Sequence, residues 1–325
     1  MSDFPGKPAY LLLLFVAVLD AALLWFLPAI SISLAQLTRM LVGPAASLLI
    51  LAVLNHMRAT RFNDAGTFVT VMLDRLVVMI SGILFLHLGW IALRLFNHLT
   101  MALGFPYADG MLLAADGLLG LNWNAYFDLV MSRPRLMTLM DWSYQSLTLV
   151  SGVAFLLLIA LGEVKRSRFF LETFLVTAIV CSSIGFLFPA EAAVKILIGG
   201  PEMFPGMAEP PGLYHLGHLD NLRSGLPLVL NLNSLPGLVT VPSFHTAAGI
   251  ILIWSFRQTV LFVPVTAYSL VMISATPVLG GHYFIDLIAG TLVALAVLVL
   301  FQRRARYRDL FHRSVPALAP GREPA

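Results

Sequence analysis

Apolar residues collect in eight long runs along the chain, separated by polar connections of varied length. The runs lie at 9–30, 37–56, 68–96, 139–161, 169–189, 244–257, 260–279 and 283–301. A helix needs roughly 20 mostly apolar residues to cross a bilayer. Because backbone amides find no water in lipid, and because the sequence lacks the alternating pattern of a membrane barrel, the runs predict helices. We therefore expect an all-α, polytopic membrane bundle of about eight spans.

The sixth run, 244–257, is the shortest of the eight. At a rise of roughly 1.5 Å per residue it covers only about 21 Å, which falls short of a full crossing. We expect this helix to be sunken into the bundle, tilted or re-entrant.

The composition supports a membrane protein and excludes several other classes. Hydrophobic residues make up 59% of the 325 residues and charged residues only 11%, whereas a soluble domain has about one quarter charged residues. The net charge of +3 comes from short basic clusters between the apolar runs, rather than from the single basic face that binds nucleic acid. Cys181 is the only cysteine, so neither an internal disulfide nor a thiolate metal cluster can form.

The lysines and arginines predict the orientation of the bundle. One set of span ends carries 12 of them and the opposite set carries 6. The richer set is Lys7, Arg58, Arg61, Lys165, Arg166, Arg168, Arg257, Arg303, Arg304, Arg306, Arg308 and Arg313, and the poorer set is Arg39, Arg94, Arg133, Arg135, Lys195 and Arg223. Because cytoplasmic ends carry the excess of basic residues, we expect both termini in the cytoplasm of a bacterium and the connections 97–138 and 190–243 on the outer side of its inner membrane.

We find no internal repeat and no second domain. Residues 1–313 are expected to form one transmembrane domain, with the chemistry in about 120–301. Residues 314–325, with the sequence SVPALAPGREPA, are expected to be a disordered tail.

The first motif with chemical content is Pro242-Ser243-Phe244-His245-Thr246-Ala247, which opens the sixth run. Pro and Ser directly before an apolar run indicate a helix start, because the Ser hydroxyl can cap free amides. His245 then lies in the first helical turn, where unpaired N–H groups and the helix dipole favour an anion.

The second motif, Gly280-Gly281-His282-Tyr283-Phe284-Ile285-Asp286, opens the last run. His282 and Asp286 are four residues apart, so on a helix they share a face. A carboxylate in that place can accept the Nδ1 proton of the imidazole and leave Nε2 as a nucleophile. Gly281 and its neighbour let the backbone approach a ligand closely.

The charge count places both helix starts at the outer face. Two imidazoles and a carboxylate beside two helix N-termini would form a phosphate pocket, provided that the two helix starts meet in space. A histidine alone at a helix start is often only a cap, but ionisable residues in membrane spans are costly and usually functional.

Together the two motifs resemble those of the type 2 phosphatidic acid phosphatase superfamily, in which Pro-Ser-X-His is followed by His-X-X-X-Asp. The forms Pro-Ser-Phe-His-Thr-Ala and Gly-Gly-His-Tyr-Phe-Ile-Asp are similar to those of its inositol phosphorylceramide synthase branch, and sphingomyelin synthases share His-Tyr-X-X-Asp. The resemblance implies a six-helix core over about 120–301, preceded here by extra N-terminal spans.

The resemblance also implies a mechanism on a membrane lipid. His282 would attack phosphorus and form a phosphohistidine, Asp286 would orient its ring, and His245 would protonate the leaving alkoxide and then activate water or an acceptor alcohol. Ser243, Gly281 and backbone amides would hold the phosphoryl oxygens. No metal or other cofactor is implied.

The chain departs from the family pattern where its phosphatases carry cations. The usual Ser-Arg pair upstream of the second histidine is replaced by Ala275 and Thr276, and the first phosphatase motif is not recognisable. We expect Arg223 to supply the missing charge, with Lys195 as a weaker candidate. The missing arginines favour a phosphotransferase over a simple phosphatase of phosphatidic acid or polyprenyl phosphate.

Other interpretations stay open. The segment His215-Leu-Gly-His218-Leu-Asp220 has a spacing that can bind zinc, although a polar loop or a head-group contact explains it as well. A lipid transporter would place polar groups at mid-membrane, whereas the informative residues here gather at one face. A non-catalytic membrane scaffold is the third alternative.

Overall fold

The computed structural model describes residues 4–60, 67–207 and 209–313. The expected disordered tail, 314–325, lies outside the described residues. Within them the chain is mostly helical, as predicted, and the eight apolar runs lie largely in helices.

Six helices are long and apolar enough to cross a membrane. They are α1 (Lys7–Phe26), α2 (Leu34–Thr60), α3 (Phe68–Met101), α8 (Val164–Gly185), α12 (Phe262–Leu279) and α13 (Phe284–Arg313). A seventh span is possible if α6 (Pro134–Gln145) and α7 (Leu147–Ala160), which meet at a bend of 62°, count as one broken crossing. The expected eight spans are therefore six, or up to seven.

The difference comes from the sixth apolar run, which forms the short helix α11 (Phe244–Phe256). This helix packs against α7, α8, α12 and α13. Ala247, Ala248, Ile251 and Leu252 on it are completely buried. Because the other helices surround α11, its length does not have to match the thickness of the bilayer.

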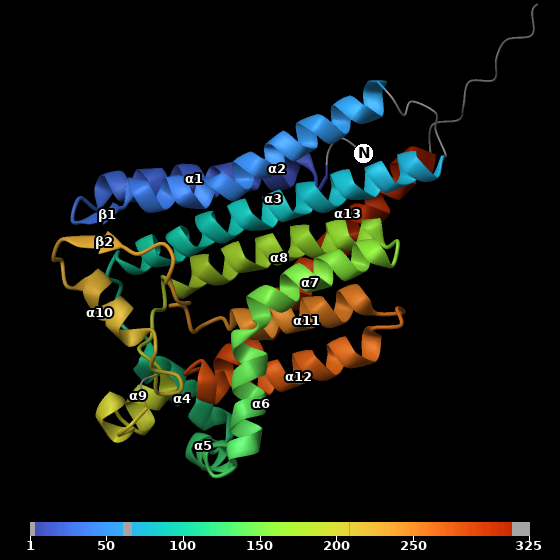
Figure 1. Cartoon of the computed structure of the whole chain (residues 1–325). Helices are drawn as coiled ribbons and strands as arrows, with labels where there is room; N and C mark the ends of the chain where they lie inside the picture. Colours follow the sequence, from blue (N-terminus) through green and yellow to red (C-terminus); the bar gives the residue numbers. More distant parts are fainter. Residues whose placement is uncertain (1–3, 61–66, 208, 314–325) are drawn as a thin grey trace, which may run out of the picture.

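The long helices run side by side, and the short elements gather at one end of the bundle (Figure 1). These are α4 (Asp109–Leu119), α5 (Trp123–Met131), α9 (Ala193–Leu197), the 3₁₀ turn η1 (Pro201–Met203) and α10 (Leu216–Arg223). The α7–α8 and α11–α12 connections lie at the opposite end, together with the end of α2, the start of α3 and the described N-terminus (Figure 1). The basic clusters of the sequence thus share one end of the bundle.

Two three-residue strands are the exception to the all-α prediction. Strand β1 (Ile30–Ile32) pairs in parallel with β2 (Leu228–Leu230), with Ser31 opposite Val229. The pairing ties the α1–α2 connection to the loop that leads into α11. The N-terminal helices and the motif-bearing half are therefore joined in two places. One is this strand pair, at the end where the short helices gather (Figure 1), and the other is the packing of α3 against α8.

Candidate active site

The starts of α11 and α13 meet. The backbone N–H of Ser243 donates to the carbonyl oxygen of Asp286 at 3.0 Å. One turn further along α13, a Cβ on Gly290 would lie 2.3 Å from the Ser243 carbonyl oxygen, so only glycine fits there without movement. Ser243 also starts α11, because its hydroxyl caps the helix by accepting from the Thr246 N–H at 3.3 Å.

His282 and Asp286 form a buried pair, as predicted, but not on a common helix face, because α13 begins at Phe284 and His282 lies in the loop before it. Nδ1 of His282 lies 3.3 Å from Oδ2 of Asp286, and the two side chains are only 3% and 0% exposed. Oδ2 also accepts the N–H of Tyr283 at 3.1 Å. Because a carboxylate oxygen accepts, Nδ1 is the donor of this pair, and Nε2 keeps its lone pair.

His245 is held by an aromatic side chain from another helix. Its ring stacks on that of Tyr144 of α6, with centroids 3.9 Å apart and planes inclined by 15°. The Tyr144 hydroxyl lies 3.2 Å from the Tyr214 hydroxyl, and a Cβ on Gly280 would lie 2.6 Å from it and 2.9 Å from Nε2 of His282. The Tyr144 hydroxyl and the unpaired nitrogen of His282 therefore border the same small space above Gly280.

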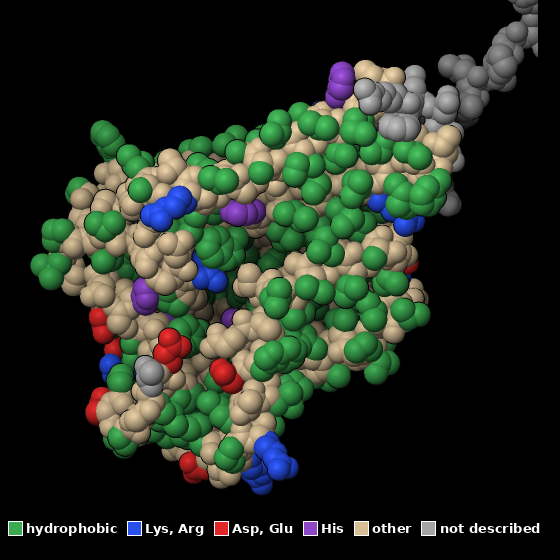
Figure 2. Space-filling view, viewed as in Figure 1, with side chains coloured by type: hydrophobic (Ala, Val, Ile, Leu, Met, Phe, Trp, Pro, Cys, Tyr) green, Lys and Arg blue, Asp and Glu red, His purple; other side chains and the backbone are tan. Residues whose placement is uncertain are grey.

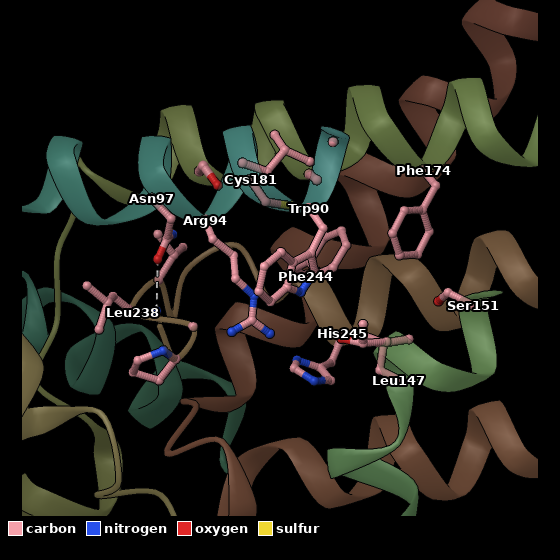
Figure 3. A pocket seen from close by; sticks show the side chains of 18 of the residues that line it. Trp90, Arg94, Asn97, Leu147, Ser151, Phe174, Cys181, Leu238, Phe244 and His245 are labelled. Atoms are coloured by element: carbon pink, nitrogen blue, oxygen red, sulfur yellow. Dashed lines mark hydrogen bonds between the residues drawn. The ribbon is translucent and has the colours of Figure 1, made fainter. Parts of the chain in front are cut away.

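Both histidines line one cavity of about 750 Å³. Figure 2 shows it as a hollow in the face that lies between α3 and α7 in Figure 1, with basic and histidine side chains visible inside. Its polar end is formed by Arg94, Tyr144, Tyr214, His215, His245 and His282. Its other end is mostly apolar and includes Leu147 and Phe174, with the Ser151 hydroxyl beside them (Figure 3). Leu171 and Leu175 of α8 also line the cavity. The cavity thus joins a group of histidines to a slot for hydrocarbon.

Two aspartates from α4 position the second motif. Asp116 accepts the N–H groups of Phe284 at 2.8 Å and Ile285 at 2.7 Å, so it caps α13 from outside the helix. Asp109 accepts the Tyr283 hydroxyl at 2.9 Å. The sequence analysis missed both residues, because a cap supplied from a distant part of the chain leaves no local pattern.

The two cations that the sequence analysis proposed as phosphate ligands do not line the cavity. The structure places Arg223 outside the residues that line the cavity: its Nη2 donates to the Phe105 carbonyl at 2.6 Å, and its guanidinium covers the Tyr107 ring at 4.0 Å. Lys195 pairs with Glu191 at 3.3 Å, also away from the lining.

The two remaining predicted phosphate ligands, Ser243 and Gly281, have structural roles in the backbone. The Ser243 side chain is buried in its cap. Gly281 has a φ of +68°, and a Cβ there would lie 2.6 Å from the Gly212 carbonyl oxygen. Gly281 therefore allows the loop before α10 to approach closely, whereas of the two motif glycines it is Gly280 that lines the cavity.

His215 and His218 turn to different partners. His215 is 2% exposed and lines the cavity, and its Nε2 lies 2.8 Å from the Glu191 carbonyl oxygen. Because that carbonyl only accepts, Nε2 carries the proton. Burial lowers the pKa of His215 to about 4. The His218 ring instead meets the His98 ring edge-on at 6.1 Å.

The lining also contains a cation that the sequence analysis passed over. Arg94 of α3 reaches into the polar end of the cavity, and among the described lining residues it is the one lysine or arginine. On the sequence it is only one polar residue at the end of an apolar run. Nothing in the spacing connects it to motifs that lie about 150 residues later.

Comparison with protein families agrees with the motifs. The model of the PAP2 superfamily, the type 2 phosphatidic acid phosphatases, matches residues 110–300, which include both motifs and more than half of the chain. Comparisons with curated proteins and with solved structures gave no match. The superfamily resemblance is thereby confirmed, while the match does not select the inositol phosphorylceramide synthase branch. This membrane protein belongs to the PAP2 superfamily, a lipid phosphatase-type family whose members work without a metal.

Proposed function

We propose that this protein is an integral membrane enzyme that transfers the phosphorylated head group of a lipid through a phosphohistidine on His282. The observation that carries the proposal is that His282, which pairs with the buried Asp286, lines the same cavity as His245. A nucleophile, a group that orients it and a second acid–base group within one site are what covalent phosphoryl transfer requires.

The first step forms the covalent intermediate. Nε2 of His282 attacks phosphorus while Asp286 holds the Nδ1 proton, and the bond from phosphorus to the leaving alkoxide oxygen breaks. His245 gives its proton to that oxygen. General acid catalysis of this kind contributes typically about 10²–10⁴-fold to the rate.

The second step breaks down the phosphohistidine intermediate. An acceptor hydroxyl gives its proton to His245 and attacks phosphorus, and the phosphorus–nitrogen bond to His282 breaks. If His282 carries the phosphorylated head group, an alcohol acceptor gives a new phosphodiester and water releases the phosphorylated head group. If His282 carries only the phosphoryl group of a lipid phosphomonoester, an alcohol acceptor gives a new phosphomonoester and water releases free phosphate. Neither step uses a metal or another cofactor.

The shape of the cavity supports a lipid as the substrate. Beyond the histidines the lining becomes apolar between α3, α7 and α8, and the hollow opens on a side of the bundle parallel to the long helices (Figures 1 and 2). In a membrane that side faces the hydrocarbon. A lipid can therefore enter sideways with its chain in the slot and its phosphate at the histidines.

We favour an alcohol as the acceptor because the motif forms resemble those of the phosphotransferase branch and because Ala275 and Thr276 stand where the phosphatases carry their Ser-Arg pair. Hydrolysis is the second candidate, and the family match favours it equally. For the orientation, we propose that both termini are cytoplasmic in a bacterial inner membrane, so that the site faces outward; the gathering of the basic connections at one end supports this.

The test compares the purified chain with His282→Ala on a panel of lipid phosphates and phosphodiesters, using phosphate release and lipid mass spectrometry. We expect turnover by the wild-type chain and a loss of at least about 10²-fold in His282→Ala. His56→Ala is the matched control, because His56 is exposed on α2 and lies outside the cavity lining. A wild-type chain with no turnover on any member would favour a transporter or a scaffold, and phosphate release without a new phospholipid would favour hydrolysis.

A further inference from the structure

Phosphoryl transfer as proposed above leaves one requirement open, namely a cation for the negative charge of the transition state. The positions that hold it in related phosphatases are Ala275 and Thr276, and both are completely buried in α12. Arg223 and Lys195 are engaged outside the cavity lining.

Arg94 lies where such a cation is needed. Its side chain descends from α3 into the cavity, and its guanidinium points towards the imidazole of His245 (Figure 3). Residues from α11 and from the loop before α13 line the same cavity, including His245 and His282. Arg94 thus stands across the polar end of the cavity from the two motifs.

The Arg94 side chain is held in place, but not all of its hydrogen-bond donors are used. Nη1 donates to the Leu235 carbonyl oxygen, and the guanidinium lies 4.9 Å from the centre of the Trp90 ring. Among the described residues, Nε and Nη2 have no hydrogen-bond acceptor, and no carboxylate forms an ion pair with Arg94. A guanidinium has five donors in a planar fork, so donors remain for an anion.

An arginine without a carboxylate partner is costly in a membrane span, and such residues usually serve a function. A guanidinium matches two oxygens of a phosphoryl group, which makes this pairing one of the stronger charge-assisted interactions. We propose that Arg94 binds the phosphoryl oxygens of the lipid substrate, so that the charge missing from α12 is supplied by α3. Residue 94 lies outside the family-matched region, 110–300.

The proposal rests on the proposed function, and anion binding tests it without any turnover. Orthovanadate, an analogue of the phosphoryl group, is titrated into the full chain in detergent, and thermal unfolding is followed by tryptophan fluorescence. A ligand that binds the folded state raises the unfolding temperature with its concentration. The variants are Arg94→Gln, Arg94→Lys and, as a matched control, Arg39→Gln. Arg39 is an exposed arginine of α2, and within the described part of the chain its side chain bonds only to the Ala35 carbonyl of its own helix.

We expect vanadate to stabilise the wild-type chain and Arg39→Gln equally. In Arg94→Gln the vanadate concentration for the half-maximal shift should rise about 10- to 100-fold, the worth of hydrogen bonds to a charged group. Arg94→Lys, which keeps the charge without the fork, should fall between the two. The unfolding temperatures without vanadate show separately what the lost contact to Leu235 does to the fold.

The outcomes separate this inference from the function beneath it. If vanadate stabilises the wild type and Arg94→Gln alike, Arg94 does not bind the phosphoryl group, while the histidine chemistry stands. If Arg94→Lys binds vanadate as tightly as the wild type, the contact through two guanidinium donors is wrong. If vanadate fails to stabilise even the wild type, the proposed function fails and the role of Arg94 fails with it.

Discussion

The amide of Ser243 donates to the carbonyl of Asp286 at 3.0 Å, which joins the first turns of two helices whose motifs lie far apart in the chain. Backbone groups make this bond, so it fixes the relative position of α11 and α13 whatever the side chains do. The space that the two histidines share is therefore a property of the fold. Changes in single side chains around that space should affect the reaction more than the stability.

Asp286→Asn should leave the fold intact and lower kcat. The amide has almost the size of the carboxylate, but it cannot hold the Nδ1 proton of His282 as an anion does, so Nε2 is no longer kept as the nucleophile. We expect a fall of about 10²–10⁴-fold in kcat, with little change in KM. Steady-state kinetics on the preferred lipid, beside thermal unfolding of the same sample, make the measurement; unaltered kcat would remove Asp286 from the mechanism.

Gly280→Ala should block the reaction by filling the space next to the nucleophile. The added Cβ would lie 2.5 Å from Cδ2 of His282, 2.9 Å from its Nε2 and 2.6 Å from the Tyr144 hydroxyl, so the side chains around it must move. Its backbone, with φ −94° and ψ −6°, accepts alanine without strain. Because a displacement of 1 Å at a reacting group can cost about 10²-fold in rate, we expect a loss of that order in kcat.

Gly217→Ala is the control for that variant. A Cβ on this α10 glycine would meet nothing within 4 Å, so the same substitution should leave turnover unchanged. Equal activity in both alanine variants would show that the space above Gly280 is not where the reaction takes place.

Substitutions of Tyr144 should separate its ring from its hydroxyl. Tyr144→Phe keeps the face on which His245 stacks, and it should retain most of kcat. Tyr144→Leu removes the face, and because such aromatic pairs contribute about 0.5–1.5 kcal/mol, we expect kcat to fall about 2- to 10-fold. Kinetics of the two variants are compared after correction for the folded fraction, and a larger loss in Phe than in Leu would contradict a stacking role.

His215 should make the protein less stable in mild acid. Burial lowers the pKa of His215 to about 4, below the 6.5 of an exposed histidine. As the pH falls from 6.5 towards 4, the unfolded chain takes up a proton that the folded chain does not, so the free energy of unfolding decreases. The contribution of this residue is fully present above pH 6.5 and amounts to about 3 kcal/mol at most.

His215→Gln tests this dependence, because its amide can still donate to the Glu191 carbonyl but does not titrate. Its unfolding temperature should vary less between pH 6.5 and 4 than that of the wild type. His56→Gln, at an exposed position, should follow the wild-type curve. If the His215 and His56 variants show the same curve, His215 does not control the acid sensitivity.

Much of the fold follows from the hydrophobic pattern. The apolar runs form helices, because length and composition decide this locally, and the short sixth run becomes the buried helix α11. The run 139–161 is divided between α6 and α7. The packing of these helices against one another, by contrast, cannot be predicted from any single run. The bend between α6 and α7 brings Tyr144 under His245, and the β1–β2 pairing joins segments about 200 residues apart, so neither could be predicted from local sequence.

The site divides in the same way. The spacing of His282 and Asp286 predicts their contact, and Ser243 caps α11 as its position suggests. The cation could not be found by reading along the chain, because Arg94 reaches the site only after α3 packs against α8. Arg223 lies near the motifs in the sequence, but it contacts Phe105 and Tyr107 instead.

Helix α3 forms one wall of the cavity although it ends at Met101, before the family-matched region begins. A fragment that starts at residue 110 would keep both histidines and Asp286, but without α3 the cavity would be open along one side. Selection can therefore change which lipid fits by altering residues of α3 while the two motifs stay the same. Related chains with different N-terminal helices would then share a reaction and differ in their substrates.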